Sequence, residues 1–389
     1  MRGDFQLVPP QFQINTIVSI TVYILLALVG FCANGQLLIT TIREWINSGR
    51  ISRLKSPTRP RVHPKPILAY TICLAMVHLF VSLNSAIIVL DIWHGEWFLG
   101  QLLCKLARTI ESINKLMSNL ILLNMGVYCC FRVCRAVLNQ FLVSVNGAVP
   151  LWFVLALTIL VSILASAPQF IYSEVFVIIR GDDNRTIIKL TNRCLFWPPE
   201  FVLAAFTAAQ FACGYLLPSI IQLICYIQVL CYIHRTKRKS TLPFAKFSVK
   251  TITRTCLLQL VLYLICWTPY WAASIYMFFC PDKSYSRVSV LIAYWLNVLP
   301  YAYSALNPVL QLILYKRREQ MRCSSLMSSR QETMHRIEAH SPSPRADSNR
   351  EHPGFFRNMV GSFRRNETQE STELLNRTYC SAKSEIIQL

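Results

Sequence analysis

The sequence predicts an all-α membrane protein, a bundle of seven transmembrane helices with its N-terminus outside the cell and its C-terminus inside. The 389-residue chain is 53% hydrophobic and only 15% charged, which is too apolar for a soluble protein of this size. A helix that crosses the bilayer core needs about 20 mostly apolar residues. Seven such stretches follow one another along the chain, at 14–42, 67–90, 105–131, 149–172, 202–233, 254–279 and 288–315. They are too long for the alternating strands of a β-barrel and leave no room for a soluble catalytic domain, so we expect no enzyme activity.

The seven spans are not equally clear. The third is the weakest, because Glu111, Lys115, Ser118 and Asn119 interrupt its apolar residues. Each of the last three spans contains a proline that removes a backbone donor and is expected to bend the helix. These prolines are Pro218, Pro269 and Pro308.

Lysine and arginine in the short loops set the orientation. The loop after the first span, 43–66, is rich in both and has one acid, Glu44, and the loop at 234–254 is basic without an acid. The loop after the second span has Asp91 and Glu96 but no lysine or arginine before Lys105. The net charge of +20 is therefore mainly an orientation signal that also attracts anionic membrane lipid. Because the basic residues flank spans and do not alternate with aromatic ones, we expect no nucleic-acid partner.

The parts outside the spans have simpler signals. We expect a short extracellular N-terminus at 1–13, the helical domain at 14–315, an amphipathic juxtamembrane helix at 316–328 and a disordered cytoplasmic tail at 329–389. The N-terminus has no apolar core of its own, so no cleaved signal peptide is expected. Asn184-Arg185-Thr186 is an N-glycosylation acceptor on the outer side, and Cys323 is a palmitoylation candidate.

Most of the 15 cysteines lie inside apolar spans, where cysteine serves as a small packing residue. Cys104, Cys194 and Cys280 face the oxidising side. A bridge between Cys104, at the start of the third span, and Cys194, in the loop before the fifth, would tie that loop to the outer end of the helix.

Short motifs, in a fixed order and on the expected spans, give the chain a family resemblance. They are Ala33-Asn34-Gly35; Leu74-Ala75-Met76-Val77; Trp97, Gly100 and Cys104; Pro218 with Tyr226; Cys266-Trp267-Thr268-Pro269; and Asn307-Pro308. Over about residues 14–325 the chain resembles the rhodopsin-like (class A) G-protein-coupled receptors. The resemblance implies a receptor in the plasma membrane that binds an extracellular ligand and engages a heterotrimeric G protein, without a cofactor.

A narrower resemblance concerns the ligand. Ser166-Ala167-Pro168-Gln169-Phe170 and the run Cys266-Trp267-Thr268-Pro269-Tyr270-Trp271 are similar to segments of the gonadotropin-releasing-hormone and vasopressin type of peptide receptor. A neuropeptide is therefore the expected ligand. Serine and threonine in the tail could take phosphate and recruit arrestin.

Three switch positions depart from the family pattern. Tyr128-Cys129-Cys130 stands where the family has Asp/Glu-Arg-Tyr, and a cysteine cannot fill the roles of that arginine. Arg132, one helical turn further along, could substitute for it. Gln311 replaces the tyrosine that follows Asn307-Pro308, so Tyr226 loses its expected partner.

The third departure is His78, which replaces an acid of the second helix. In the family this acid holds sodium together with the positions of Asn34, Ser118, Ser304 and Asn307. Imidazole is not the hard oxygen ligand that sodium prefers, so we expect neither a sodium site nor another metal site.

Two explanations of these departures stay open. The protein could be a diverged receptor whose inactive state is less tightly locked. It could instead be a poorly coupling co-receptor that acts in a heteromer with another receptor, for a small amphiphilic or pheromone-like ligand. A transporter would be expected to show internal repeats or broken helices. An opsin is excluded because the seventh span has no lysine for a Schiff base.

The candidate ligand site is in the outer half of the bundle. Glu111 and Lys115 lie roughly 10 and 16 Å below Cys104 along a helix. They are four residues apart and can pair, either as a self-contained ion pair or as partners for a peptide arginine or terminal carboxylate. Aromatic residues of the sixth helix and one face of the seventh would line the site, with an acid at its rim. These residues are Trp267, Tyr270, Trp271, Tyr294, Asn297, Tyr301 and Asp91.

Overall fold

The computed structural model describes residues 10–54, 65–138, 151–182, 185–236, 243–279 and 287–339. The chain forms two compact units, residues 1–312 and 313–389. Every element below belongs to the first unit, except that the helix α10 continues into the second. The predicted glycosylation site Asn184 lies outside the described residues, as do residues 1–9 and 340–389.

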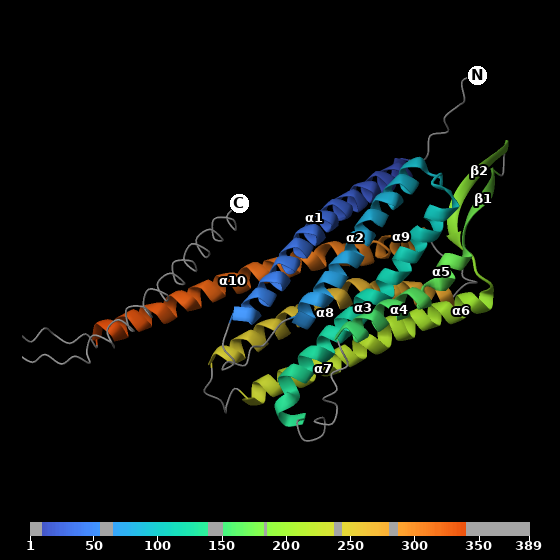
Figure 1. Ribbon diagram of the computed structural model, residues 1–389. Coiled ribbons are helices and arrows are strands. Elements are labelled where there is room, and N and C mark those ends of the chain that lie inside the picture. Colours follow the sequence, from blue (N-terminus) through green and yellow to red (C-terminus); the bar gives the residue numbers. More distant parts are fainter. Residues whose placement is uncertain are drawn as a thin grey trace, which may run out of the picture. The chain divides into compact units, whose positions relative to one another are not determined.

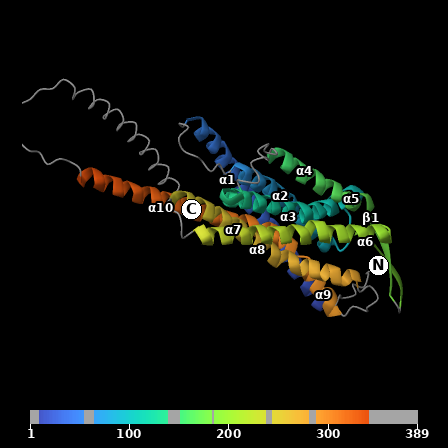
Figure 2. The same ribbon diagram turned by 90° about the horizontal axis from the view of Figure 1, so that it is seen from below.

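Helices account for all seven predicted spans. The first three are α1 (Pro10–Leu54), α2 (Lys65–His94) and α3 (Gly100–Leu138). The fourth is α4 (Leu151–Ala165) with the short α5 (Ala167–Tyr172), and the fifth is α6 (Glu200–Ala209), the π-helix η2 (Gln210–Leu216) and α7 (Leu217–Thr236). The last two are α8 (Pro243–Phe279) and the pair α9 (Arg287–Leu296) and α10 (Leu299–Ala339). In Figures 1 and 2, α2, α3, α7 and α8 run alongside one another.

Five helical segments of the described chain are long and apolar enough to cross a membrane. They are Thr16–Asn47, Ile67–His94, Phe153–Tyr172, Glu200–Tyr232 and Thr253–Phe278. The helix α3 is less apolar because polar residues interrupt it, as the sequence indicated. It packs against α2, α4, α7 and α8, so these polar residues face protein. The apolar part of α10 is short, because Lys316 follows Tyr315.

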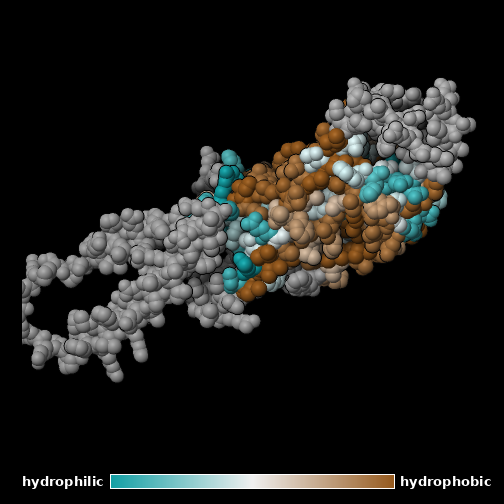
Figure 3. Space-filling view, turned by 90° about the horizontal axis from the view of Figure 1, so that it is seen from above, coloured by the Kyte–Doolittle hydropathy of each residue, from teal (hydrophilic) through white to brown (hydrophobic). Residues whose placement is uncertain are grey.

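Polar side chains lie inside the bundle and large apolar ones cover its outer surface. Asn34, His78 and Asn119 are completely buried, whereas Leu28 and Phe31 of α1 are exposed. Figure 3 shows the apolar residues as a broad band over the bundle, with hydrophilic residues near both ends of the band. A surface of this kind is stable in contact with lipid chains and would aggregate in water.

The helices α1 and α2 approach each other closely at Gly30. A Cβ atom at this position would overlap the Oγ atom of Ser82 in α2, so only glycine fits without a rearrangement. One turn further along α1, Asn34 donates from Nδ2 to the Gly30 carbonyl (2.7 Å) and to the Ser304 carbonyl of α10 (3.1 Å). The buried asparagine expected in the first span therefore joins α1 to the seventh span.

A β hairpin interrupts the otherwise helical fold. Its strands, β1 (Ser173–Asp182) and β2 (Arg185–Phe196), are antiparallel, with Val175 opposite Cys194. The sequence predicted only a loop here. The run Val175-Phe176-Val177-Ile178-Ile179 is rich in β-branched and aromatic residues, which favour a strand, and could have indicated the hairpin.

The helix α10 runs without a break from Leu299 to Ala339. The juxtamembrane helix predicted at 316–328 falls within this range. The boundary between the seventh span and that helix remains a prediction.

Candidate functional site

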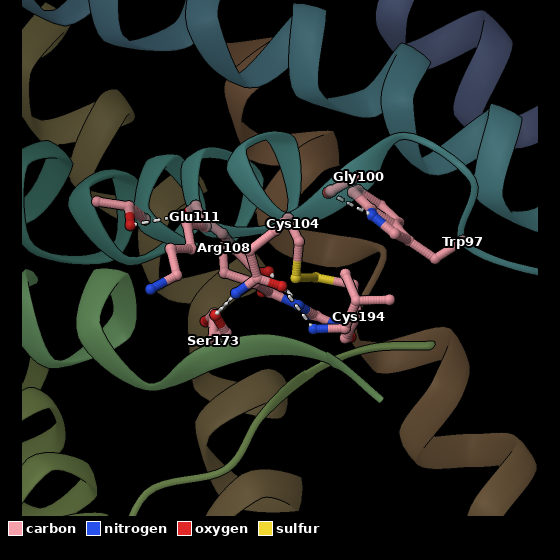
Figure 4. The surroundings of a disulfide bond; sticks show 11 residues. Trp97, Gly100, Cys104, Arg108, Glu111, Ser173 and Cys194 are labelled. Carbon is pink, nitrogen blue, oxygen red and sulfur yellow. Dashed lines mark hydrogen bonds and ion pairs between the residues drawn. A yellow bond between two sulfur atoms is a disulfide. The ribbon is translucent and has the colours of Figure 1, made fainter. Parts of the chain in front are cut away.

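The β hairpin is bonded to the outer end of α3. The predicted disulfide between Cys104 of α3 and Cys194 of β2 is present (Figure 4). Near it, Gln101 donates from Nε2 to the Ser173 carbonyl (3.0 Å) and accepts a hydrogen bond from the Val175 N–H at Oε1 (2.9 Å). Both strands of the hairpin are therefore fixed to α3.

Trp97 and Gly100 shape the connection from α2 to α3. The Trp97 indole donates from Nε1 to the Gly100 carbonyl (2.9 Å), as Figure 4 shows, and the Trp97 N–H donates to the Asn192 carbonyl of β2 (2.9 Å). Gly100 has φ 78°, a left-handed conformation that favours glycine. The two residues therefore hold the turn against the hairpin.

Three charged residues follow one another along α3 below the disulfide. Glu111 forms an ion pair with Lys115 (Oε1 to Nζ, 3.2 Å), as the sequence suggested, and a second one with Arg108 (Oε2 to Nη1, 3.5 Å). Arg108 also donates from Nη2 to the Cys194 carbonyl (3.0 Å). The charged cluster of Arg108, Glu111 and Lys115 therefore connects the hairpin to the interior of the bundle.

The charged cluster has two cations and one anion, so it carries one unbalanced positive charge. The side chains of Glu111 and Lys115 are only 22% and 19% exposed, and that of Arg108 is 40% exposed. Charge held inside a membrane protein is costly unless it is paired. An anionic group that reached Arg108 from the outer side would therefore be bound favourably.

The aromatic residues predicted from the sixth and seventh spans lie beside the charged cluster. The Lys115 Nζ atom lies over the Tyr270 ring, 5.1 Å from its centre, which is a cation–π contact. Tyr270 packs edge-on against Trp267 (5.7 Å between ring centres) and Trp271 (5.5 Å). Trp267 is completely buried, and Tyr270 links it to Lys115 of the charged cluster.

The other predicted ligand residues have different surroundings. Tyr301 packs edge-on against Tyr23 of α1, with Ile110 of α3 in the same apolar cluster, so it lies beside the site. Asn297 is exposed and donates to the Ala293 carbonyl of its own helix segment (2.9 Å), and nothing in the described residues brings it to the charged cluster. Asp91 lies within electrostatic range of Arg193 and Arg108, and its role at the rim of the site remains a prediction.

A polar connection lies deeper in the bundle, where α3 meets η2 and α7. Asn119 donates from Nδ2 to the carbonyls of Gly214 (2.9 Å) and Tyr215 (3.2 Å), and Gln222 donates from Nε2 to Asn119 Oδ1 (2.7 Å). Gly214 lies in the π-helix η2, and Pro218 has no N–H to donate to the carbonyls of the preceding turn. Asn119 therefore supplies a donor that Pro218 removes.

Substitution of Asn119 with leucine tests this role. We expect Asn119→Leu to cost about 1 to 3 kcal/mol of stability, because it leaves the buried Gly214 carbonyl without its donor. The apparent melting temperature of the detergent-solubilised protein measures the loss. In a Pro218→Ala background residue 218 regains its N–H, so Asn119→Leu should cost less there. Equal losses in the two backgrounds would contradict this account.

Sequence reasoning missed Arg108 and the role of Asn119, although a signal for both exists. Polar residues recur along α3 at spacings of three and four, which places them on one face of the helix. They are Arg108, Glu111, Ser112, Lys115, Ser118 and Asn119. Ser112 also joins α3 to neighbouring segments, since its Oγ donates to Ser166 Oγ (3.0 Å) and accepts from Gln210 Nε2 (2.7 Å).

His78 lies where the family pattern has an acid. Its Nε2 atom is 3.3 Å from Ser118 Oγ, and its ring packs edge-on against Tyr303 (5.4 Å between centres). Asn307 accepts from Gln259 Nε2 at its Oδ1 atom (3.3 Å). These contacts fit a hydrogen-bonding histidine, and the expectation that sodium does not bind here remains a prediction.

At the inner end of α3, Cys129 is buried and its Sγ atom lies 3.7 Å from Cys256 Sγ of α8. Cys130 donates to Gln228 Oε1 of α7 (3.3 Å). Tyr226 of α7 belongs to the same buried cluster as Cys129 and hydrogen-bonds to the Cys256 thiol. A thiol pair thus occupies the place where the family has an arginine.

The remaining switch and modification positions are only partly visible. Gln311 is buried in α10, and Pro269 and Pro308 lie inside α8 and α10 as predicted. Arg132 and Cys323 lie in α3 and α10, but their side chains fall outside the described ones. Their predicted roles remain predictions.

The sequence matches a protein family and several known proteins. The model of the family described as "7 transmembrane receptor (rhodopsin family)" matches residues 58–310. A probable G-protein coupled receptor of Caenorhabditis elegans is 28% identical over 311 residues, which cover 78% of this chain and 67% of that receptor. Neuropeptide receptor 18 of the same species is 22% identical (76% and 64% covered), and galanin receptor type 1 of Rattus norvegicus is 26% identical (56% and 59% covered). The matches therefore span about two thirds or less of the length of these relatives.

Proposed function

Because the chain belongs to the rhodopsin family of seven-transmembrane receptors, a family of receptors and not of enzymes, we propose that it binds an extracellular neuropeptide and signals through a heterotrimeric G protein. Its place is the plasma membrane, which it crosses several times. The peptide enters from the side of the β hairpin. An anionic group of the peptide, either its free C-terminus or an acidic side chain, binds at the charged cluster.

The unbalanced charge of the charged cluster is the observation that carries this proposal. Glu111 is already shared between Arg108 and Lys115, so it has little capacity for a cationic ligand. Arg108 is the more exposed of the two cations and lies under the hairpin, next to Cys194. Its guanidinium can bind a carboxylate with two parallel hydrogen bonds. Of the two ligand groups that the sequence left open, this favours a carboxylate over a peptide arginine.

The relatives favour a peptide over a small amphiphile. One is named as a neuropeptide receptor, and others are named as receptors for galanin and somatostatin. The hairpin and the charged cluster offer a peptide polar and aromatic contacts at successive depths. The narrower likeness to receptors of the gonadotropin-releasing-hormone and vasopressin type remains a prediction.

The aromatic contacts offer a route from the ligand to the inner face. Lys115 contacts Tyr270, and Tyr270 contacts Trp267, which lies two residues before Pro269. A ligand that draws Lys115 or Arg108 away from Glu111 changes the packing of the side chains along this chain of contacts. The proline gives α8 a point at which it can bend. Contacts of the tail with arrestin and of the basic loops with membrane lipid belong to the same proposal.

A co-receptor that acts in a heteromer is the second candidate function. Cys129 favours the co-receptor function, because a buried thiol in contact with another thiol cannot contact a G protein as a charged arginine does. On this alternative the chain binds its ligand and a partner receptor carries the signal.

The test expresses the full chain alone in cells and measures G-protein activation by energy transfer. The probes are synthetic neuropeptides, each made with a free and with an amidated C-terminus, or with an acidic residue replaced by its amide. We expect the acid form of an active peptide to be about tenfold or more stronger than its amide, because the lost contact is a charge-assisted hydrogen bond. Arg108→Gln should remove this difference.

Lys105→Gln is the matched control, because Lys105 is a cation on the same helix that contacts Phe170 and the Ile171 carbonyl and not Glu111. It should keep the preference for the acid form. Equal potency of acid and amide forms would contradict the anionic contact. A chain that binds a labelled peptide but activates no G protein, and gains activation with Cys129→Arg, would favour the co-receptor function.

A further inference from the structure

Two buried thiols touch each other at the inner end of the bundle. Cys129 of α3 and Cys256 of α8 are 127 residues apart in sequence, and their Sγ atoms are 3.7 Å apart. Their exposed fractions are 3% and 1%. They share an apolar cluster with Met125 and Leu260. The two sulfurs are in van der Waals contact, and a disulfide needs them to approach to about 2 Å.

We propose that Cys129 and Cys256 are an oxidation site, at which a peroxide converts the thiol pair into a disulfide that ties α3 to α8. Cys129 Sγ attacks one oxygen of hydrogen peroxide, the O–O bond breaks, and the thiol proton leaves with the departing hydroxide as water. Cys129 is then a sulfenic acid. Cys256 Sγ attacks this sulfur, the S–S bond forms, and the hydroxyl leaves with the proton of Cys256 as a second water. The two sulfurs are oxidised and the peroxide is reduced.

Burial determines how this pair reacts. Buried thiols react slowly, so a small neutral oxidant such as hydrogen peroxide fits the site better than a bulky disulfide such as oxidised glutathione. The same burial shields the finished disulfide from thiols that would reduce it. The modification is therefore slow to form and slow to reverse.

The position of the bond gives it a mechanical effect. Cys256 lies on the inner side of Pro269, a point at which α8 can bend, and Trp267 lies close to that proline. A covalent link to α3 holds the inner part of α8 against α3 whatever happens at Trp267. We therefore expect the disulfide to reduce G-protein coupling. That loss rests on the proposed function, whereas formation of the bond does not.

A second thiol pair is the main competitor. Cys130, the next residue along α3, hydrogen-bonds to Cys225 of α7 and to Gln228 Oε1 (3.3 Å). Cys130 is more exposed than Cys129. Because Cys225 and Cys256 lie on different helices, peptide mapping separates the two possible links.

The experiment treats membranes that contain the full chain with hydrogen peroxide and then blocks remaining thiols with N-ethylmaleimide. Non-reducing digestion and mass spectrometry identify the linked peptides. We expect a peptide that joins Cys129 to Cys256, present in the Cys130→Ser variant and absent in Cys256→Ser. Cys266→Ser removes another buried cysteine of α8 and should leave the link intact. The Cys104–Cys194 peptide is the internal control for detection.

A melting experiment gives a second reading of the same link. Peroxide should raise the apparent melting temperature of the solubilised wild-type protein, while Cys256→Ser shows no such rise. Absence of the Cys129–Cys256 peptide while the Cys104–Cys194 peptide is found would overturn the proposal, as would a link between Cys130 and Cys225 alone. Both readings need neither ligand nor G protein, so they stand or fall separately from the proposed function.

Discussion

Loss of the Cys104–Cys194 disulfide is expected to destabilise the outer end of the protein and to abolish high-affinity peptide binding. The bond joins residues 90 apart, and disulfides that close long loops contribute about 2 to 4 kcal/mol. Without it, the hairpin keeps the hydrogen bonds of Gln101 and Arg108 to α3 but has no covalent link to that helix. We expect Cys104→Ser and Cys194→Ser to lower the apparent melting temperature equally, and the double substitution to lower it no further.

Cys213→Ser controls for the loss of a thiol, because Cys213 is an exposed free cysteine of η2. Its melting temperature and surface expression should match those of the wild-type protein. Melting and peptide binding that are unchanged in Cys104→Ser would show that the hairpin is held without the covalent bond.

Substitution of Glu111 with glutamine is expected to have the second large effect. Glu111→Gln removes the carboxylate that Arg108 and Lys115 share, so the charged cluster changes from one to two unbalanced positive charges. Removal of one partner from a buried ion pair costs about 3 to 5 kcal/mol. Because the Glu111 and Lys115 side chains keep about a fifth of their exposure, we expect a loss of about 2 to 3 kcal/mol. Thermal melting of the solubilised protein and surface expression measure it.

A compensating substitution separates charge from packing. Glu111→Gln combined with Lys115→Met has one unbalanced positive charge, as the wild-type charged cluster does, and methionine keeps most of the length of lysine. We therefore expect the double variant to melt at a higher temperature than Glu111→Gln alone. A double variant no more stable than the single one would show that unbalanced charge does not cause the loss.

The sequence alone predicted the seven spans and their order because long apolar stretches depend only on local composition. It also predicted the Cys104–Cys194 bond, because few cysteines lie on the oxidising side of the membrane. The ion pair of Glu111 with Lys115 followed from their spacing of four residues on a helix. The strands β1 and β2 were not predicted, because a short β-branched run between two spans also fits a loop.

Other features need the folded chain. Nothing in the sequence places Cys256 next to Cys129, because the pairing depends on how α3 and α8 pack. Arg108 lies four residues after Cys104, and the sequence alone did not single it out as a partner of Glu111. Asn119 was read as an interruption of an apolar span. Its role follows only from the structure, in which it donates hydrogen bonds to the Gly214 and Tyr215 carbonyls near Pro218.

The polar face of α3 has a consequence for how the protein is made. A charged residue near the centre of a helix adds about 2.5 to 3.5 kcal/mol to the cost of insertion by the translocon. With Glu111 and Lys115 in its sequence, α3 is poorly suited to leave the translocon alone. Glu111 and Lys115 can pair within α3, but Asn119 on the same helix finds its partners on η2 and α7, which are synthesised later. Biogenesis of this receptor therefore requires α3 to be retained near the insertion machinery, or beside α2, until the fifth span emerges.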